Sequence, residues 1–310
     1  MKRSLITTIV FLFAIILCAS SAAPADRSRL RFIAAGAGEF TFDTGLLSGK
    51  LRGEGKSVGL LPVVHIPSGA TLTRSMGFAG HYRVFSTNNR YGPGAWYWPS
   101  ETKLAGDGSV ETHWSADAER PFDMWAVYRW AAPGTLDVET RVLPSTDIPD
   151  FEVFEAQYFS EGFSESLVYA RGGPGGKPAF VPAEQSEGVW QMFPRDGEAV
   201  KMIQDGRWKI PPSPVDWVIR PALEQPVGIR RHGASGLAIV MMAPPEDCFA
   251  VSTPHQAEGH YSMYFSLFGR TLKAGEPARA RVRIMLMTAP TDNEVLDAYT
   301  AYLRELRGRR

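Results

Sequence analysis

Two clusters of aromatic and charged side chains are the part of this sequence best suited to binding chemistry. The first spans residues 81–98, and the second spans residues 190–208. Flat rings with a polar edge beside Arg and Glu match a sugar, which offers an apolar face for stacking and hydroxyls for hydrogen bonds. Packing of the same rings in the core is the alternative interpretation. The candidate ligand-binding residues are Arg83, Arg90, Tyr91, Trp98, Arg195, Arg207 and Trp208.

Two carboxylates stand close together in the segment 151–159, at Glu152 and Glu155. The apolar alternation of this segment slips between Val153 and Phe154, and a β-bulge there would turn both acids to one face. Two carboxyl groups roughly 6 to 10 Å apart can act as acid and base across a sugar. The alternative is a pair of solvated acids on an exposed sheet face.

Histidines provide the other acid-base candidates, because an imidazole titrates near neutral pH. His255 and His260 flank Glu258 in a segment that also holds proline and glycine. A surface loop fits this composition better than a metal site, and we expect no metal and no cofactor. The expected proton-transfer residues are His81, Glu155, His255 and Glu258.

Signatures of nucleotide and serine-hydrolase sites are missing from the sequence. The Gly-Ala-Gly run at 36–38 is followed by Thr41 where a dinucleotide fingerprint needs its third glycine. The run 162–166 lacks the closing glycine of a nucleophile elbow. The 33 basic residues balance the 33 acidic residues, so nucleic acid is not an expected partner.

The elements that must position these residues are mostly strands. Apolar and polar residues alternate over 136–142 and again over 279–286, which is typical of antiparallel sheets. Turn dipeptides separate such stretches, and the 30 Gly and 23 Pro leave little room for long helices. One helix is predicted at about 292–307, where Thr291 and Glu294 form a capping box before apolar residues at helical spacing. The sequence therefore predicts an all-β fold, a large antiparallel β-sandwich with a C-terminal α-helix.

Residues 1–25 have the order of a signal peptide. Basic residues at 2 and 3 precede an apolar run over 5–17, and small residues follow. This run is short for a membrane span of roughly 20 residues, so we expect cleavage after Ala22 or Ala25 rather than an uncleaved anchor. The expectation is a single domain over 26–310 in the periplasm or outside the cell, without membrane contact after cleavage.

Three short motifs resemble the galactose mutarotase-like (aldose 1-epimerase-like) group over roughly residues 35 to 290. They are the run Ala-Pro-Gly-Thr-Leu-Asp-Val-Glu at 132–139, Gln-Tyr-Phe at 157–159 and Leu-Lys-Ala-Gly-Glu at 272–276. The resemblance implies a β-supersandwich fold and a carbohydrate ligand. Ala156 stands where the sugar mutarotases place their general-acid histidine, so the resemblance leaves the mechanism open. The family's carboxylate base would fall near Glu258.

Together these features favour an exported carbohydrate-active protein that binds a sugar or glycan on one concave sheet face. Epimerase, lyase and hydrolase chemistry all fit, because each needs a positioned acid and base with a charge-stabilising arginine. A non-catalytic glycan-binding module would need the aromatic rings but not the acids. A structural envelope protein is the third alternative, and the oligomeric state is open.

Overall fold

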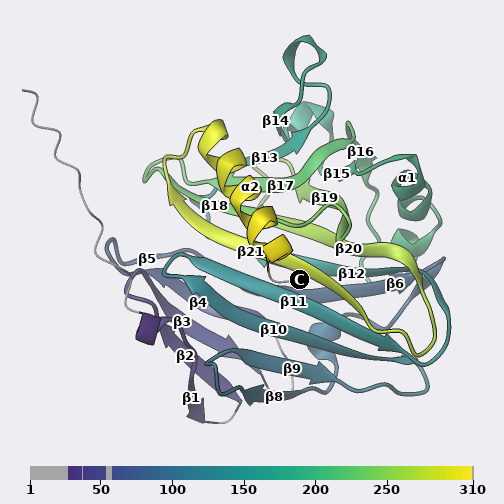
Figure 1. Cartoon of the computed structure of the whole chain (residues 1–310). Coiled ribbons are helices and arrows are strands. Elements are labelled where there is room, and N and C mark those ends of the chain that lie inside the picture. Colours follow the sequence, from purple (N-terminus) through teal and green to yellow (C-terminus); the bar gives the residue numbers. More distant parts are fainter. Residues whose placement is uncertain (1–26, 37, 54–57, 309–310) are drawn as a thin grey trace, which may run out of the picture.

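Three sheets build the computed structural model, which describes residues 27–36, 38–53 and 58–308 (Figure 1). The predicted signal peptide at 1–25 lies outside the described residues. The N-terminal sheet has five strands in sequence order. They are β1 (Ile33–Gly36), β2 (Glu39–Asp43), β3 (Leu47–Arg52), β4 (Gly59–His65) and β5 (Ala70–Thr71).

The nine-stranded sheet has the order β14-β13-β17-β18-β21-β11-β10-β9-β8 and is antiparallel throughout. Its strands are β8 (Glu101–Leu104), β9 (Val110–Trp114), β10 (Phe122–Ala132), β11 (Thr135–Pro144), β13 (Glu165–Ala170), β14 (Ala179–Pro182), β17 (Leu223–Arg231), β18 (Leu237–Met242) and β21 (Ala278–Thr288). The stretches of alternation predicted at 136–142 and 279–286 are β11 and β21, which pair directly.

The seven-stranded sheet has the order β16-β15-β19-β20-β12-β6-β7, and only its short β15–β16 pair is parallel. Its strands are β6 (Gly80–Ser86), β7 (Asn89–Arg90), β12 (Ile148–Tyr158), β15 (Trp190–Pro194), β16 (Val218–Ile219), β19 (Cys248–Pro254) and β20 (Ser262–Leu272). The helices are α1 (Gly197–Ile203) and α2 (Asp292–Gly308), with 3-10 turns η1 (Arg27–Arg29), η2 (Ala95–Tyr97), η3 (Pro174–Gly176), η4 (Gln185–Glu187) and η5 (Arg207–Lys209).

The main core takes apolar side chains from all three sheets. Phe42 of β2, Trp130 of β10 and Phe151 of β12 belong to one buried cluster, and the Phe42 and Trp130 ring centroids are 4.7 Å apart. Sheets that stack face to face bury their inner faces in this way, and removal of this apolar area from water drives folding. The predicted all-β sandwich is confirmed.

Helix α2 covers part of the outer face of the nine-stranded sheet, over β17 and β18 (Figure 1). The predicted capping box is present: Glu294 Oε2 accepts from the Thr291 backbone N–H at 2.8 Å, and Thr291 Oγ1 accepts from the Glu294 backbone N–H at 3.3 Å. Tyr302 is buried against the sheet, and Glu305 pairs with Arg283 of β21 at 2.8 Å. Among the described residues, neither helix has the length and apolar character needed to cross a bilayer.

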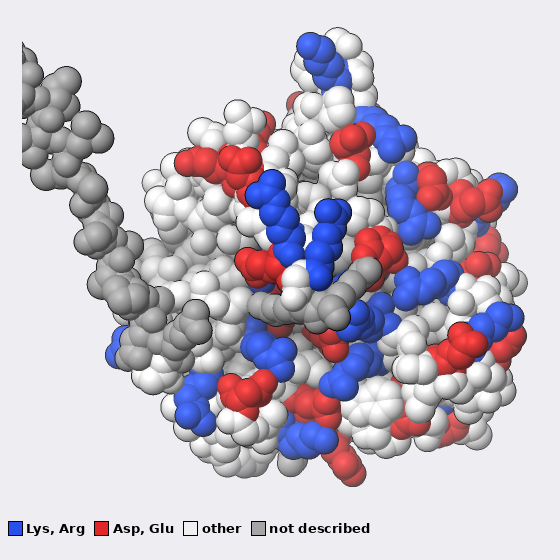
Figure 2. Space-filling view, in the orientation of Figure 1, with Lys and Arg blue, Asp and Glu red and all other residues white. Residues whose placement is uncertain are grey.

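Charges of both signs intermix on the face around the end of α2 (Figure 2). Arg129 of β10 pairs with Asp107, and Arg141 of β11 pairs with Glu111 of β9. Such pairing leaves no large area of one sign on the face that Figure 2 shows, in agreement with the equal counts of acidic and basic residues.

Strand β12 corrects the predicted β-bulge. Glu152 bonds Arg207 on the outer face of the seven-stranded sheet, whereas Glu155 faces inward opposite His81 of β6. The irregularity near this point lies in β6, where Tyr82 is the extra residue between the partners of Phe154 and Glu155. The prediction of one shared face was therefore wrong, and so was the alternative of solvated acids, because both carboxylates are fully buried. Both faces of β12 are covered, so its sequence is apolar on both sides and conceals the alternation.

Candidate functional site

A pocket of about 330 Å³ opens on the outer face of the seven-stranded sheet, where the segment 207–217 lies over β6, β12 and β20. We call it the aromatic pocket, because seven of the residues that line it are Phe, Tyr or Trp. Its lining residues are Tyr82, Arg83, Phe154, Tyr158, Trp190, Trp208, Ser213, Pro214, Val215, Trp217, His260 and Tyr264.

The aromatic walls support one another. Phe154 of β12 stacks on Tyr264 of β20 with centroids 4.5 Å apart. Trp208 meets Phe154 edge to face at 4.8 Å, and Trp217 meets Trp208 edge to face at 5.2 Å. Trp190 closes the wall against Trp217 at 5.9 Å. Rings held in this geometry need little reordering when a ligand stacks on them.

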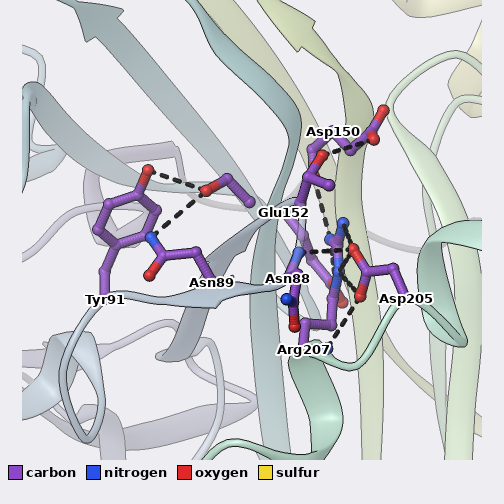
Figure 3. Close-up of polar contacts among 9 residues, drawn as sticks. Asn88, Asn89, Tyr91, Asp150, Glu152, Asp205 and Arg207 are labelled. Carbon is purple, nitrogen blue, oxygen red and sulfur yellow. Dashed lines mark hydrogen bonds and ion pairs between the residues drawn. The ribbon is translucent and has the colours of Figure 1, made fainter.

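Arg207 anchors the segment that covers the pocket (Figure 3). Its Nη1 donates to Glu152 Oε2 at 3.0 Å and to the Asp150 carbonyl oxygen at 3.0 Å, and its Nε and Nη2 donate to the Asp205 carboxylate. Burial alone would lower the pKa of Arg207, but Glu152 and Asp205 raise it above its usual value. Arg207 therefore holds Trp208 in place and does not itself line the pocket.

Two further arginines hold the same covering segment through backbone carbonyls. Arg83 of β6 donates from Nη2 to the Ser213 carbonyl oxygen at 2.9 Å and to Tyr82 Oη at 3.3 Å. Its guanidinium lies 4.8 Å from the Tyr82 ring centroid and 5.3 Å from that of Trp208. Arg90 of β7 donates from Nη1 to the carbonyl oxygens of Ile210 and Pro212. Burial and the neighbouring charge of Arg83 lower the pKa of Arg90 to about 10.

A histidine and a carboxylate meet at the rim of the aromatic pocket. His260 Nδ1 lies 2.7 Å from Glu258 Oε1, and Glu258 Oε2 accepts the His260 backbone N–H at 2.8 Å. An ionised carboxylate only accepts, so it holds the proton on Nδ1 and leaves Nε2 as a base. The His260 ring also contacts Trp190, with centroids 5.3 Å apart. The dyad can therefore move a proton at the edge of a ligand in the pocket.

Two further candidates for proton transfer, His81 of β6 and Glu155 of β12, lie on the inner face of the seven-stranded sheet. His81 Nε2 is 2.8 Å from Thr140 Oγ1 of β11, and burial lowers the pKa of His81 to about 4. Glu155 Oε1 accepts from Gln157 Nε2 at 2.8 Å, and burial raises the pKa of Glu155 to about 8. The sheet itself separates both side chains from the aromatic pocket.

The remaining predicted residues also lie outside the pocket. Tyr91 and Trp98 pack on Phe122 in the main core, at 5.1 and 6.2 Å between ring centroids. His255 is buried in a turn, where its Nδ1 accepts from the Ala257 backbone N–H at 3.2 Å. Arg195 pairs with Asp196 at 2.8 Å, beside the start of α1. Of the predicted site residues, the structure brings Arg83 and Trp208 to the wall of the pocket and Glu258 to its rim.

Trp217 and Tyr264 line the pocket but were not singled out from the sequence. Tyr264 lies in a strand that is buried on both faces, so its pattern gives no sign of an open pocket. Trp217 follows the Pro-rich run at 211–214, and an aromatic residue at the end of such a run is the signal that could have identified it.

A larger hollow of about 440 Å³ lies beside the β20–β21 hairpin but is less suited to a ligand. Its lining is mainly charged, and its charges pair with each other: Arg281 Nε lies 2.6 Å from Asp247 Oδ2 and Arg281 Nη2 lies 3.5 Å from Glu246 Oε1. The aromatic pocket is therefore the better candidate site.

No protein-family model and no curated protein matches the sequence. Solved structures do match the fold. A galactose mutarotase related enzyme from Lactobacillus acidophilus has a TM-score of 0.50 at 9% identity, over 82% of this chain and 98% of that chain. A putative aldose 1-epimerase from Escherichia coli K12 has a TM-score of 0.46 at 12% identity, over 80% and 98%. An alpha-N-acetylgalactosaminidase from Bifidobacterium bifidum has 0.49 at 15%, over 90% and 39%. The chain has the galactose mutarotase-like fold, and the likeness at these identities concerns the fold alone.

Proposed function

We propose that this chain binds a carbohydrate in the aromatic pocket. The observation that carries the proposal is the composition of that pocket, with seven aromatic side chains, one arginine and one histidine around about 330 Å³. Stacked rings match the apolar face of a sugar, and the polar edges of Tyr, Trp and His match its hydroxyls. The volume lies at the lower end of ligand pockets, which is suitable for one or two sugar rings. A sugar ligand also agrees with the fold shared with a galactose mutarotase related enzyme.

The N-terminal pattern of residues 1–25 supports a second part of the proposal, that the chain is exported. A glycan outside the cytoplasm would then be the ligand. Fractionation of cells that produce the full chain tests this part, since cytoplasmic retention of an unprocessed protein would contradict it.

Replacement of Trp217 with alanine should weaken sugar binding by roughly thirtyfold, or about 2 kcal/mol. Trp217 is half-buried and supplies one wall of the pocket, so the change removes stacking area without opening the main core. The measurement is titration calorimetry with ligands found in a panel of oligosaccharides. Trp125 is the matched control, because it is also half-buried but lies in the nine-stranded sheet, where it stacks on His113. Equal loss in both variants, or no binding of any oligosaccharide by the wild type, would refute the proposal.

Proton transfer by the Glu258–His260 dyad is the second candidate function, favoured by the 2.7 Å contact between Nδ1 and Oε1. If turnover of a bound sugar is found, as anomeric exchange or new chain ends, His260→Gln should reduce its rate by roughly 10²- to 10⁴-fold. Binding should fall by a smaller factor than turnover, because glutamine keeps a polar group at this position of the pocket wall. His65→Gln is the control, because His65 bonds Ser68 in a distant turn. Full activity in His260→Gln would exclude the dyad from catalysis.

A further inference from the structure

Charge in the aromatic pocket is unbalanced toward the positive. Arg83 lines the pocket at 4% exposure and has no ion pair within the described part of the chain. Its Nε and Nη1 are buried and find no acceptor among the described residues. None of the residues that line the pocket is an Asp or Glu, and the nearby carboxylate of Glu258 is already bonded to His260.

Several buried arginines of this protein are neutralised by carboxylates, whereas the fully buried Arg230 donates to neutral oxygens of Phe163, Thr253 and Ser262. Arg207 pairs with Glu152 and Asp205, and Arg283 pairs with Asp137 and Glu305. An unpaired buried cation is costly because it loses hydration without gaining an opposite charge. Arg83 therefore differs from Arg207 and Arg283 in leaving its charge without a carboxylate partner at the wall of the pocket.

Arg90 adds a second positive charge close to that of Arg83. Arg90 bonds backbone carbonyl oxygens and, within the described ranges, no carboxylate, and its charge interacts with that of Arg83. Arg90 does not line the pocket, so it adds positive potential without contacting a ligand. Arg83 also lies close enough to Tyr158 and Tyr264, on the floor of the pocket, for its charge to act on both phenols.

We propose, on the basis of the sugar-binding function above, that the pocket selects a sugar that carries an oxyanion, which Arg83 receives. Guanidinium N–H groups bond carboxylate and sulfate oxygens with charge assistance, and such hydrogen bonds are stronger than those to neutral hydroxyls. The guanidinium lies over the rings of Tyr82 and Trp208, so an anion at Arg83 places the attached sugar ring against the aromatic walls. Uronates and sulfated sugars both present this chemistry.

The test compares acidic oligosaccharides with neutral forms of the same chains. Oligouronates are titrated beside their methyl esters, which keep the ring and lose the charge, and sulfated oligosaccharides beside their desulfated forms. We expect the wild type to bind the charged member of at least one pair at least roughly tenfold more tightly, with the preference falling as salt rises. Whichever pair shows the preference identifies the anion as carboxylate or sulfate.

Arg83→Gln should weaken binding of the charged member at least roughly tenfold more than binding of the neutral member, whose affinity also falls because Arg83 holds Ser213. Arg83→Lys should keep part of the preference, because the charge remains without the planar donor group. Arg195→Gln is the matched control, since Arg195 pairs with Asp196 outside the pocket. Near-ultraviolet circular dichroism checks the fold. If Arg83→Gln does not fold, Arg83→Lys and the salt dependence of the wild type decide the question.

The two proposals can fail separately. If neutral members bind as tightly as charged ones, the oxyanion inference is wrong and sugar binding stands. Loss of charged and neutral binding alike in a folded Arg83→Gln protein also overturns the inference, because Arg83 would then only hold the covering segment through Ser213. If no member of any pair binds, the sugar-binding proposal itself falls.

Discussion

Replacing Arg207 with alanine should lower the free energy of unfolding by about 3–5 kcal/mol. The guanidinium is fully buried and pairs with Glu152, which is also fully buried. Its removal leaves the Glu152 carboxylate without its cation in a site that water does not reach, and it frees the Asp205 end of the covering segment (Figure 3). Urea denaturation of the wild type and the variant measures the difference.

An exposed ion pair provides the control for this prediction. Lys201 and Glu198 pair on the surface of α1 with side chains 74% and 73% exposed, so Lys201→Ala should leave the stability nearly unchanged. Joint replacement of Arg207 by Met and Glu152 by Leu should recover much of the stability, because the fully buried carboxylate is removed with its cation, and Asp205 is partly exposed and still accepts from the Asn88 backbone N–H. A loss below about 1 kcal/mol in Arg207→Ala would mean that the pair does not hold the segment.

Glu155 should make the protein less stable as the pH rises from about 6.5 to about 8. Its pKa rises from 4.5 in the unfolded chain to about 8 in the fold, because burial disfavours the charged carboxylate. The folded state therefore keeps a proton that the unfolded state has released, and stability falls by about 1.4 kcal/mol per pH unit in this interval. The expected loss is about 2 kcal/mol.

His81 has the opposite effect on the pH dependence of stability, and it does so at lower pH. Its pKa falls from 6.5 to about 4 in the fold, so its contribution is present above pH 6.5 and lost as the pH falls toward 4. The two slopes offset each other between about 4.5 and 6.5, and Glu155 acts alone above that. His81 and Glu155 are cross-strand partners, so both effects belong to one buried site.

Glu155→Gln tests this assignment, since its amide oxygen can still accept from Gln157 Nε2. We expect the stability loss between pH 6.5 and 8 to disappear in that variant when denaturation midpoints are measured across the interval. Glu198→Gln, on the exposed surface of α1, should keep the loss. The same decline in all three proteins would place its origin elsewhere.

The features that were predictable from sequence are those that local pattern determines. Alternation at 136–142 marked a strand because one face of β11 is buried, and Thr291 with Glu294 marked the start of α2 because both halves of the cap lie three residues apart. The orientation of β12 was not predictable in this way. Its outer face is covered by residues 207–217, which come from a distant part of the chain.

For the candidate site too, local sequence pattern predicted some features, and contacts between distant segments determined the others. Arg83 and Trp208 were identified because each lies in a local cluster of aromatic and charged residues. Local clustering also selected Tyr91 and Trp98, which the fold turns into the core, and it could not separate Arg207 from Trp208, neighbours that face a salt bridge and a pocket respectively. Which side of a strand is open depends on contacts between segments far apart in sequence.

Part of the segment that covers the pocket is held through its backbone carbonyl oxygens and not through its side chains. Arg83 and Arg90 bind the carbonyl oxygens of Ile210, Pro212 and Ser213, and such bonds do not depend on which side chains those positions carry. Residues 213–217 can consequently be exchanged to reshape the pocket while the sheets beneath stay unchanged. An engineer seeking new ligand preferences would therefore randomise this short stretch first.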